Sequence, residues 1–167
     1  MKPALLVIDI QNEYLPMVPE QEKNLALRMI NNAIRLFWEY GFPVIRVYHA
    51  DPQYGPKPDT EAFEFPSSIG IRPQDPKIVK NHPNAFKRTD LDQLLRREGC
   101  NTLFLCGLSA VGCVLATYHG ATDLDYEVFM IKNALMSHNS SYTHFVEDIF
   151  NAVGFNALTI ILEQARK

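Results

Sequence analysis

Three residues whose side chains could cooperate in hydrolysis stand at the ends of predicted strands or just beyond them, namely Asp9, Lys80 and Cys113. Cys113 belongs to the stretch NTLFLCGLSAVGCVLAT, in which a short apolar run is followed by small residues and then by a helical pattern. The thiol is therefore predicted in the first turn of a helix. There the helix dipole and the unpaired backbone N–H groups should lower its pKa and favour the reactive thiolate.

A base is needed to turn a thiol into a nucleophile, and Asp9 is the candidate. It closes the apolar run ALLVIDI, so burial is expected to raise its pKa toward a useful value. Lys80 would hold the carboxylate in place and balance the charge of the thiolate. Backbone N–H groups of the turn from Ser109 to Cys113 could stabilise the oxyanion of a tetrahedral intermediate. Each residue taken singly also has an ordinary structural explanation, and it is their joint placement that favours a site.

Alternating strands and helices are predicted to position these groups. The patterns indicate strands at 4–10, 43–49, 77–80, 101–106, 126–132 and 157–162, and helices at 20–40, 91–98, 111–122 and 141–153. This alternation predicts an α/β fold with a mostly parallel sheet and helices on both faces. In such folds ligands bind beyond the carboxyl ends of the strands. Residues 51–76 hold six of the eleven prolines and are predicted to form a long, rigid surface loop that binds or covers the ligand.

The composition limits the number of domains, the kinds of partner and the chemistry of the cysteines. With 167 residues, 47% hydrophobic and 21% charged, the chain is expected to form one domain over 1–167. A net charge of -3 gives no reason to expect nucleic acid or an anionic membrane as partner. The N-terminal apolar run is too short for a signal peptide, so a cytoplasmic location is expected. The three cysteines match no zinc pattern and are expected to be free thiols.

Three spaced motifs resemble those of the isochorismatase-like cysteine hydrolases, the superfamily of nicotinamidases, N-carbamoyl amidohydrolases and isochorismatases. The matching segments are ALLVIDIQNEY, VKNHPNAFKRTDLDQLL and GLSAVGCVLAT. The resemblance implies a catalytic triad of Asp9, Lys80 and Cys113 in a three-layer α/β/α, Rossmann-like fold with a six-stranded sheet. It also implies a cis peptide bond between Leu108 and Ser109, which would aim the N–H groups of Ser109 and Cys113 at the oxyanion. Members of the family usually form dimers or larger homo-oligomers, and the same is expected here.

Four further residues are candidates for substrate binding: Gln11, Tyr14, Phe86 and Tyr118. Nicotinamidases of the superfamily bind a metal through an aspartate and histidines that follow the second strand. Here only His49 and Asp51 stand in that segment, and zinc needs three or four protein ligands. We therefore expect no metal and no other cofactor, and we interpret His49 as a packed or loop-anchoring residue.

The function predicted from these residues is cysteine-dependent hydrolysis of a small amide or carbamoyl compound through a thioester. The substrate is expected to be held by Tyr14 and by the loop 51–76. Three alternatives stay open: vinyl ether hydrolysis of the isochorismatase type, which needs no thiol; a nicotinamidase with a metal site; and an idle family member that acts in an oligomer.

Overall fold

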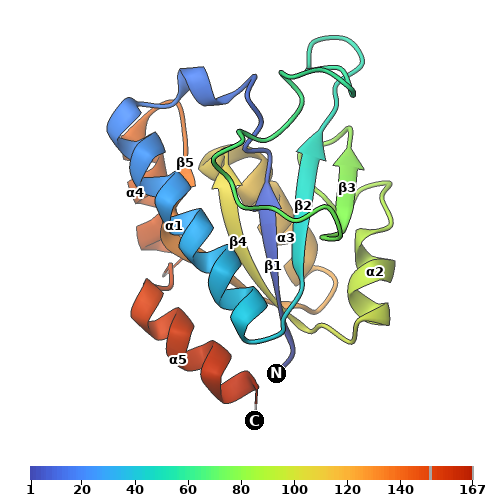
Figure 1. The fold of residues 1–167 in the computed structure, drawn as a ribbon, viewed down its shortest axis with the longest axis vertical. Coiled ribbons are helices and arrows are strands. Elements are labelled where there is room, and N and C mark those ends of the chain that lie inside the picture. Colours follow the sequence, from blue (N-terminus) through green and yellow to red (C-terminus); the bar gives the residue numbers. More distant parts are fainter. Residues whose placement is uncertain (151, 167) are drawn as a thin grey trace.

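Five parallel strands form one sheet in the computed structural model, which describes residues 1–150 and 152–166. The strand order is β3-β2-β1-β4-β5, so the N-terminal strand lies at the centre (Figure 1). The strands are β1 (Pro3–Ile8), β2 (Val44–His49), β3 (Lys77–Lys80), β4 (Thr102–Leu108) and β5 (Glu127–Met136). Both β1 and β4 are buried throughout, because a central parallel strand is covered on both faces.

Helices cover both faces of the sheet and give the three layers. The helices are α1 (Glu20–Glu39), α2 (Leu91–Arg97), α3 (Leu115–Thr122), α4 (Ser140–Ile149) and α5 (Phe155–Ala165), with short turns η1 (Leu15–Met17) and η2 (Ala110–Val114). Leu5 and Val7 of β1 face a core that α1 and α5 complete, whereas Leu6 and Ile8 face a second core with α2, α3 and α4 (Figure 1). This division follows from the alternation of side chains along a strand. Within the described residues, no helix has the length and apolar character needed to cross a membrane.

The predicted sixth strand at 157–162 is wrong, because this segment lies in α5. Its apolar run is short, and a short apolar run is compatible with either a strand or a buried helix. The buried positions Leu158 and Leu162 are four residues apart, which is the spacing of a helix face. Next to β5, Val153 makes a single parallel bridge to Ile131. Over residues 1–150 and 152–166, the sheet thus has five strands rather than six.

Strand β5 continues beyond its predicted end at 132. Its pairing with β4 shifts register between Leu105, which faces Met130, and Gly107, which faces Leu135. Asn133 lies at the irregularity with a left-handed φ of 62, and its N–H donates to the Glu147 carboxylate at 2.6 Å. Asparagine adopts a positive φ more readily than most residues, so an asparagine after an apolar run favours the end of a strand. Here the strand resumes after Asn133. The chain after Met136 therefore leaves the sheet at its carboxyl edge.

The segment 51–76 contains no strand and no helix, as predicted, but it packs on the sheet as part of the core. Phe63 and Phe65 are buried, and their rings stack on Tyr48 with centroid distances of 5.1 and 4.2 Å. The backbone N–H groups of Asn12 and Glu13 donate to carbonyl oxygens of this segment at 2.9 Å. The segment consequently supports the chain that follows β1.

Candidate active site

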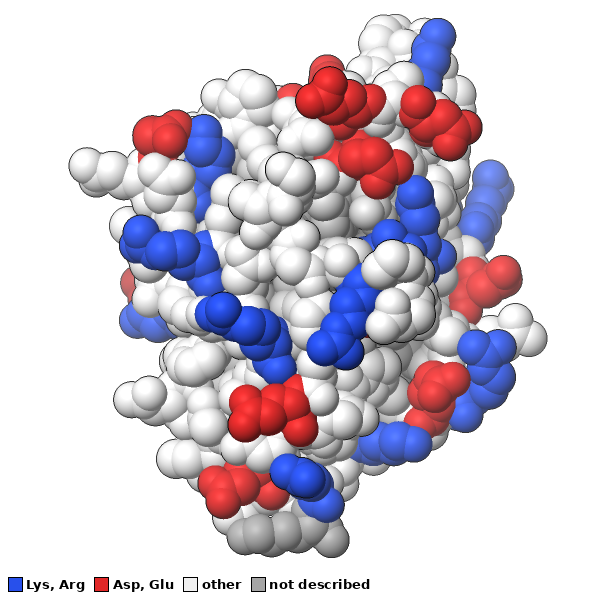
Figure 2. Space-filling view, in the orientation of Figure 1, with Lys and Arg blue, Asp and Glu red and all other residues white. Residues whose placement is uncertain are grey.

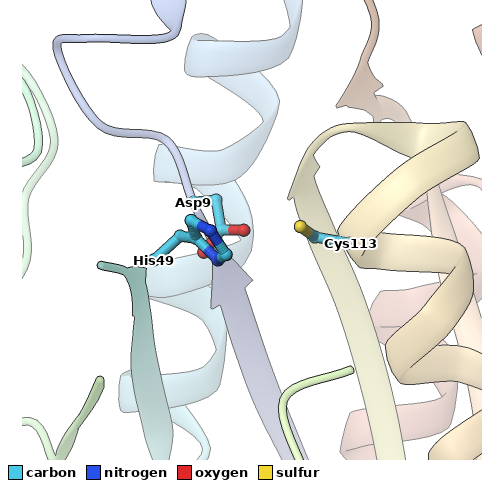
Figure 3. Close-up of side chains that lie close together, drawn as sticks. All are labelled: Asp9, His49 and Cys113. Atoms are coloured by element: carbon cyan, nitrogen blue, oxygen red, sulfur yellow. The ribbon is translucent and has the colours of Figure 1, made fainter. Parts of the chain in front are cut away.

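The carboxyl edge of the sheet brings the three predicted groups together. Asp9 directly follows β1, Lys80 ends β3, and Cys113 lies in η2 after β4. Nζ of Lys80 lies 2.7 Å from Oδ2 of Asp9. Sγ of Cys113 lies within 4.8 Å of a carboxylate oxygen of Asp9 and of a ring nitrogen of His49. Figure 3 shows the sulfur turned toward the Asp9 carboxylate, with the His49 ring beside it.

The backbone that carries these groups is shaped by two unusual conformations. Asp9 has a φ of 51, and its N–H donates to the Val47 carbonyl at 2.9 Å, which fixes the backbone of Asp9 beside the end of β2. Gly107 has a φ of 120, and a Cβ there would lie 2.0 Å from the carbonyl oxygen of Ile8. Only glycine fits this position, so β4 can lie against β1 just before the turn that carries Cys113.

Ser109 stands at the start of that turn. The Leu108–Ser109 peptide bond is cis. Within the described residues the backbone N–H of Ser109 donates no hydrogen bond, and Ser109 lines the pocket beside Cys113. A free backbone donor next to the thiol is what an oxyanion requires.

The two oxygens of the Asp9 carboxylate have different surroundings. Oδ2 accepts the hydrogen bond from Lys80, whose side chain is fully buried. Oδ1 is buried and has no hydrogen-bond partner among the described residues. Burial raises the pKa of Asp9, while the Lys80 ammonium acts in the opposite direction. The carboxylate is thus held on one side and free to accept a proton on the other.

The prediction of a lowered pKa for Cys113 is wrong for the resting site. Burial, followed by the negative charge of Asp9, raises the pKa of Cys113 to about 12, and the Lys80 ammonium opposes this only in part. The thiol is therefore protonated before it reacts, and its proton has to leave as the sulfur attacks. The other two cysteines are buried, and burial raises the pKa of each.

A pocket of about 220 Å³ opens above the thiol. Its lining residues are Asp9, Tyr14, Met17, His49, Leu108, Ser109, Cys113 and His138. This volume suits a small molecule, and the lining combines the reactive groups with apolar walls. No residue of the segment 51–76 is among them, so the expected contact of this loop with substrate stays a prediction.

Comparison with known proteins shows the family to which the chain belongs. The sequence model of the Isochorismatase domain matches residues 3–157. The chain belongs to the isochorismatase family. It is 33% identical over 143 residues to the uncharacterized isochorismatase family protein YddQ of Bacillus subtilis (strain 168), covering 80% of this chain and 77% of that protein. It is 30% identical over 181 residues to the uncharacterized isochorismatase family protein YecD of Escherichia coli O157:H7, covering 90% and 95%.

Solved structures agree with this assignment. The crystal structure of N-carbamoylsarcosine amidase from Thermoplasma acidophilum superposes with a TM-score of 0.79 at 25% identity, covering 92% of this chain and 95% of that one. The fold prediction is confirmed apart from the number of strands. The chain is an isochorismatase-family hydrolase.

The predicted substrate-binding residues of this isochorismatase-family chain divide into two groups. Tyr14 lines the pocket, whereas Gln11, Phe86 and Tyr118 do not. The Gln11 amide is buried against the backbone of β2, Phe86 packs on the Tyr126 ring, and Tyr118 packs on the Phe150 ring. Tyr118 stands five residues beyond Cys113, which turns it about 140° away around a helix.

Four pocket residues were not predicted as site residues: Met17, His49, Leu108 and His138. His138 was missed because β5 was expected to end at 132, which would have left it far from the edge. His49 ends β2 at the same edge as Asp9, and this position in a parallel sheet was the signal that could have identified it.

A metal ion does not fit the side chains that converge here. Asp9, His49 and Cys113 could each offer a ligand atom, but the Lys80 ammonium lies 2.7 Å from Asp9 and 3.1 Å from Nδ1 of His49. A fixed positive charge in contact with two of the three donors repels a cation. Asp51 uses a carboxylate oxygen to accept from the N–H groups of Gln53 and Tyr54, and it is not part of this group.

Proposed function

We propose that this protein hydrolyses a small amide or carbamoyl compound through a thioester on Cys113. The observation that carries the proposal is the free Oδ1 of Asp9, a buried proton acceptor next to a thiol that is protonated at rest. The name of the similar N-carbamoylsarcosine amidase supports the substrate class.

The first half-reaction forms the thioester. The Cys113 proton moves to Oδ1 of Asp9 as the sulfur bonds to the substrate carbonyl carbon. The resulting oxyanion receives hydrogen bonds from the backbone N–H groups of Ser109 and Cys113. When the C–N bond breaks, the protonated Asp9 gives its proton to the departing nitrogen, which leaves as ammonia or an amine.

The second half-reaction uses the same groups in reverse. Asp9 takes a proton from water, the hydroxide adds to the thioester carbonyl, and the sulfur leaves and recovers the proton. Lys80 keeps the carboxylate oriented throughout and stabilises the thiolate as it forms and departs. Because this ammonium occupies the place that a cation would need, we infer that the reaction requires no metal.

A screen of primary amides, ureas and N-carbamoyl acids, measured by release of ammonia, tests the proposal. The wild-type protein should act on at least one compound, and Cys113→Ala should lose at least about 10³-fold in rate. Treatment with a chelator should leave the rate unchanged. Ammonia release that survives in Cys113→Ala, or that disappears on chelation and returns with zinc, would overturn the proposal.

A further inference from the structure

His49 has a place in the site that the proposed reaction does not use. Nζ of Lys80 lies 3.1 Å from Nδ1 of His49, while the same ammonium donates to Asp9. A protonated lysine has three N–H donors and no lone pair, so it can only donate to the ring. Nδ1 of His49 is therefore the acceptor, and in a neutral ring the proton must be on Nε2.

The backbone that carries this ring is held from several sides. The Gln11 side chain accepts from the His49 N–H at 2.8 Å and donates to the His49 carbonyl at 3.0 Å. The next residue, Ala50, donates its N–H to the Lys80 carbonyl at 2.9 Å. Gln11, expected to bind substrate, thus fixes the backbone of His49. Burial and the Lys80 charge lower the pKa of His49 below its ordinary value, which favours the neutral ring.

Nε2 of His49 is left without a protein partner. It makes no hydrogen bond to the described residues, and it is not among the buried side-chain atoms that lack one. Since His49 lines the pocket beside the thiol and Nε2 is not a buried atom without a partner, we infer that this nitrogen is open to the pocket. A fixed N–H donor in that place needs an acceptor, and a bound substrate can supply one.

We propose that His49 is a substrate-binding residue, whose Nε2–H donates to an acceptor oxygen of the substrate. The inference rests on the proposed function for the identity of the substrate as an amide or carbamoyl compound. Because the donor is neutral, the acceptor can be an uncharged oxygen, such as a second carbonyl next to the one attacked by Cys113.

The tautomer is tested without any substrate. Protein labelled with ¹⁵N-histidine should show, in long-range ¹H–¹⁵N correlation spectra at pH 7, a neutral His49 ring protonated on Nε2. The signal is assigned by its absence from His49→Gln. A ring protonated on Nδ1, or a charged imidazolium at pH 7, overturns the proposal whatever the enzyme hydrolyses.

The binding role is tested with two variants of different reach. In His49→Asn the amide oxygen can replace Nδ1 as the acceptor for Lys80, but no donor remains at the position of Nε2. In His49→Gln the longer amide brings an N–H to that position. With the compound found in the screen, we expect His49→Asn to raise KM about tenfold or more with little change in kcat. His49→Gln should recover most of this loss, and the exposed His144→Asn on α4 serves as the matched control.

The outcomes separate the two proposals. If KM is unchanged in His49→Asn while Cys113→Ala is inactive, the role of His49 is refuted and the proposed function stands. If kcat falls equally in His49→Asn and His49→Gln without a change in KM, His49 acts only through Lys80, which also refutes a contact with substrate. Thermal unfolding of each variant shows whether it is folded.

Discussion

The thiol of Cys113 is the group whose chemistry the site has to change. At rest its pKa is raised to about 12 by burial and by Asp9, so little thiolate exists at neutral pH. The thiol is nevertheless the accessible one, because Cys100 and Cys106 are buried and Cys113 lines the pocket. Accessibility and proximity to Asp9, rather than a low pKa, are what make this cysteine the proposed nucleophile.

The accessibility and the raised pKa of Cys113 predict how the three cysteines react with iodoacetamide. Cys113 should be labelled before the other two cysteines, and its rate should keep rising from pH 7 to pH 10, because the thiolate fraction grows until the pH reaches the pKa. Peptide mass spectrometry over this range measures the rate at each cysteine. A rate that already levels off near pH 7, or labelling of Cys100 first, contradicts the assignment.

Asp9→Asn should have opposite effects on turnover and on alkylation. An amide cannot accept the thiol proton, so hydrolysis should fall by about 10³-fold or more. The same change removes the negative charge that raises the pKa of Cys113 and leaves Lys80 nearby, so the thiol should be alkylated faster than in wild type at pH 8. Slower alkylation in a folded Asp9→Asn protein would show that the two groups do not interact as described.

At the scale of elements, the parallel pairing of β1 with β4 positions Asp9 and the turn that carries Cys113. Gly107→Ala should destabilise the protein by roughly 2–4 kcal/mol, because the methyl group meets the Ile8 carbonyl and the left-handed φ disfavours alanine. Gly154→Ala is the matched control, since nothing lies within 4 Å of its Cβ position and its φ is -71. Urea unfolding of both variants gives the comparison. Equal stability of the two would show that β4 can move away from β1.

Much of the arrangement of strands and site residues was predictable from sequence, and the predictions that failed did so for physical reasons. The positions of Asp9, Lys80 and Cys113 at one edge followed from apolar runs and the rule for parallel strands. The end of β5 could not be predicted in this way, because the irregularity at Asn133 involves a hydrogen bond to Glu147 of α4, which the local sequence does not show. The direction of the Cys113 pKa also failed, because a helix start suggests a lowered value, whereas burial of the thiol, which the local sequence does not show, raises it together with the Asp9 charge.

For the molecule as a whole, charge and association remain matters of prediction. Lys and Arg side chains and Asp and Glu side chains are both spread over the face shown in Figure 2. The expectations of no nucleic-acid or membrane partner, and of a homo-oligomer, stay predictions.

The stability of the whole fold should depend on Cys113 at high pH. The thiol has a pKa of about 12 in the folded protein and 9.0 as its reference value, so between these values the unfolded chain binds fewer protons than the folded one. Unfolding is therefore favoured as pH rises, and stability should fall by up to about 1.4 kcal/mol per pH unit above pH 9 from this group. Cys113→Ser has no thiol at this position, so its stability should not show this fall above pH 9. The free energies of unfolding of the two proteins should be parallel below pH 8 and diverge above pH 9; parallel curves to pH 11 would contradict a raised pKa.

The most direct test of the central claim is the mass of the protein during turnover. Wild-type protein mixed with a compound from the screen and quenched in acid should carry the acyl or carbamoyl group of that compound on the peptide containing Cys113. The adduct should disappear as substrate is consumed, and Cys113→Ser should not form the thioester. Rapid hydrolysis with no adduct on Cys113 at any quench time, together with undiminished turnover in Cys113→Ala, would contradict the account.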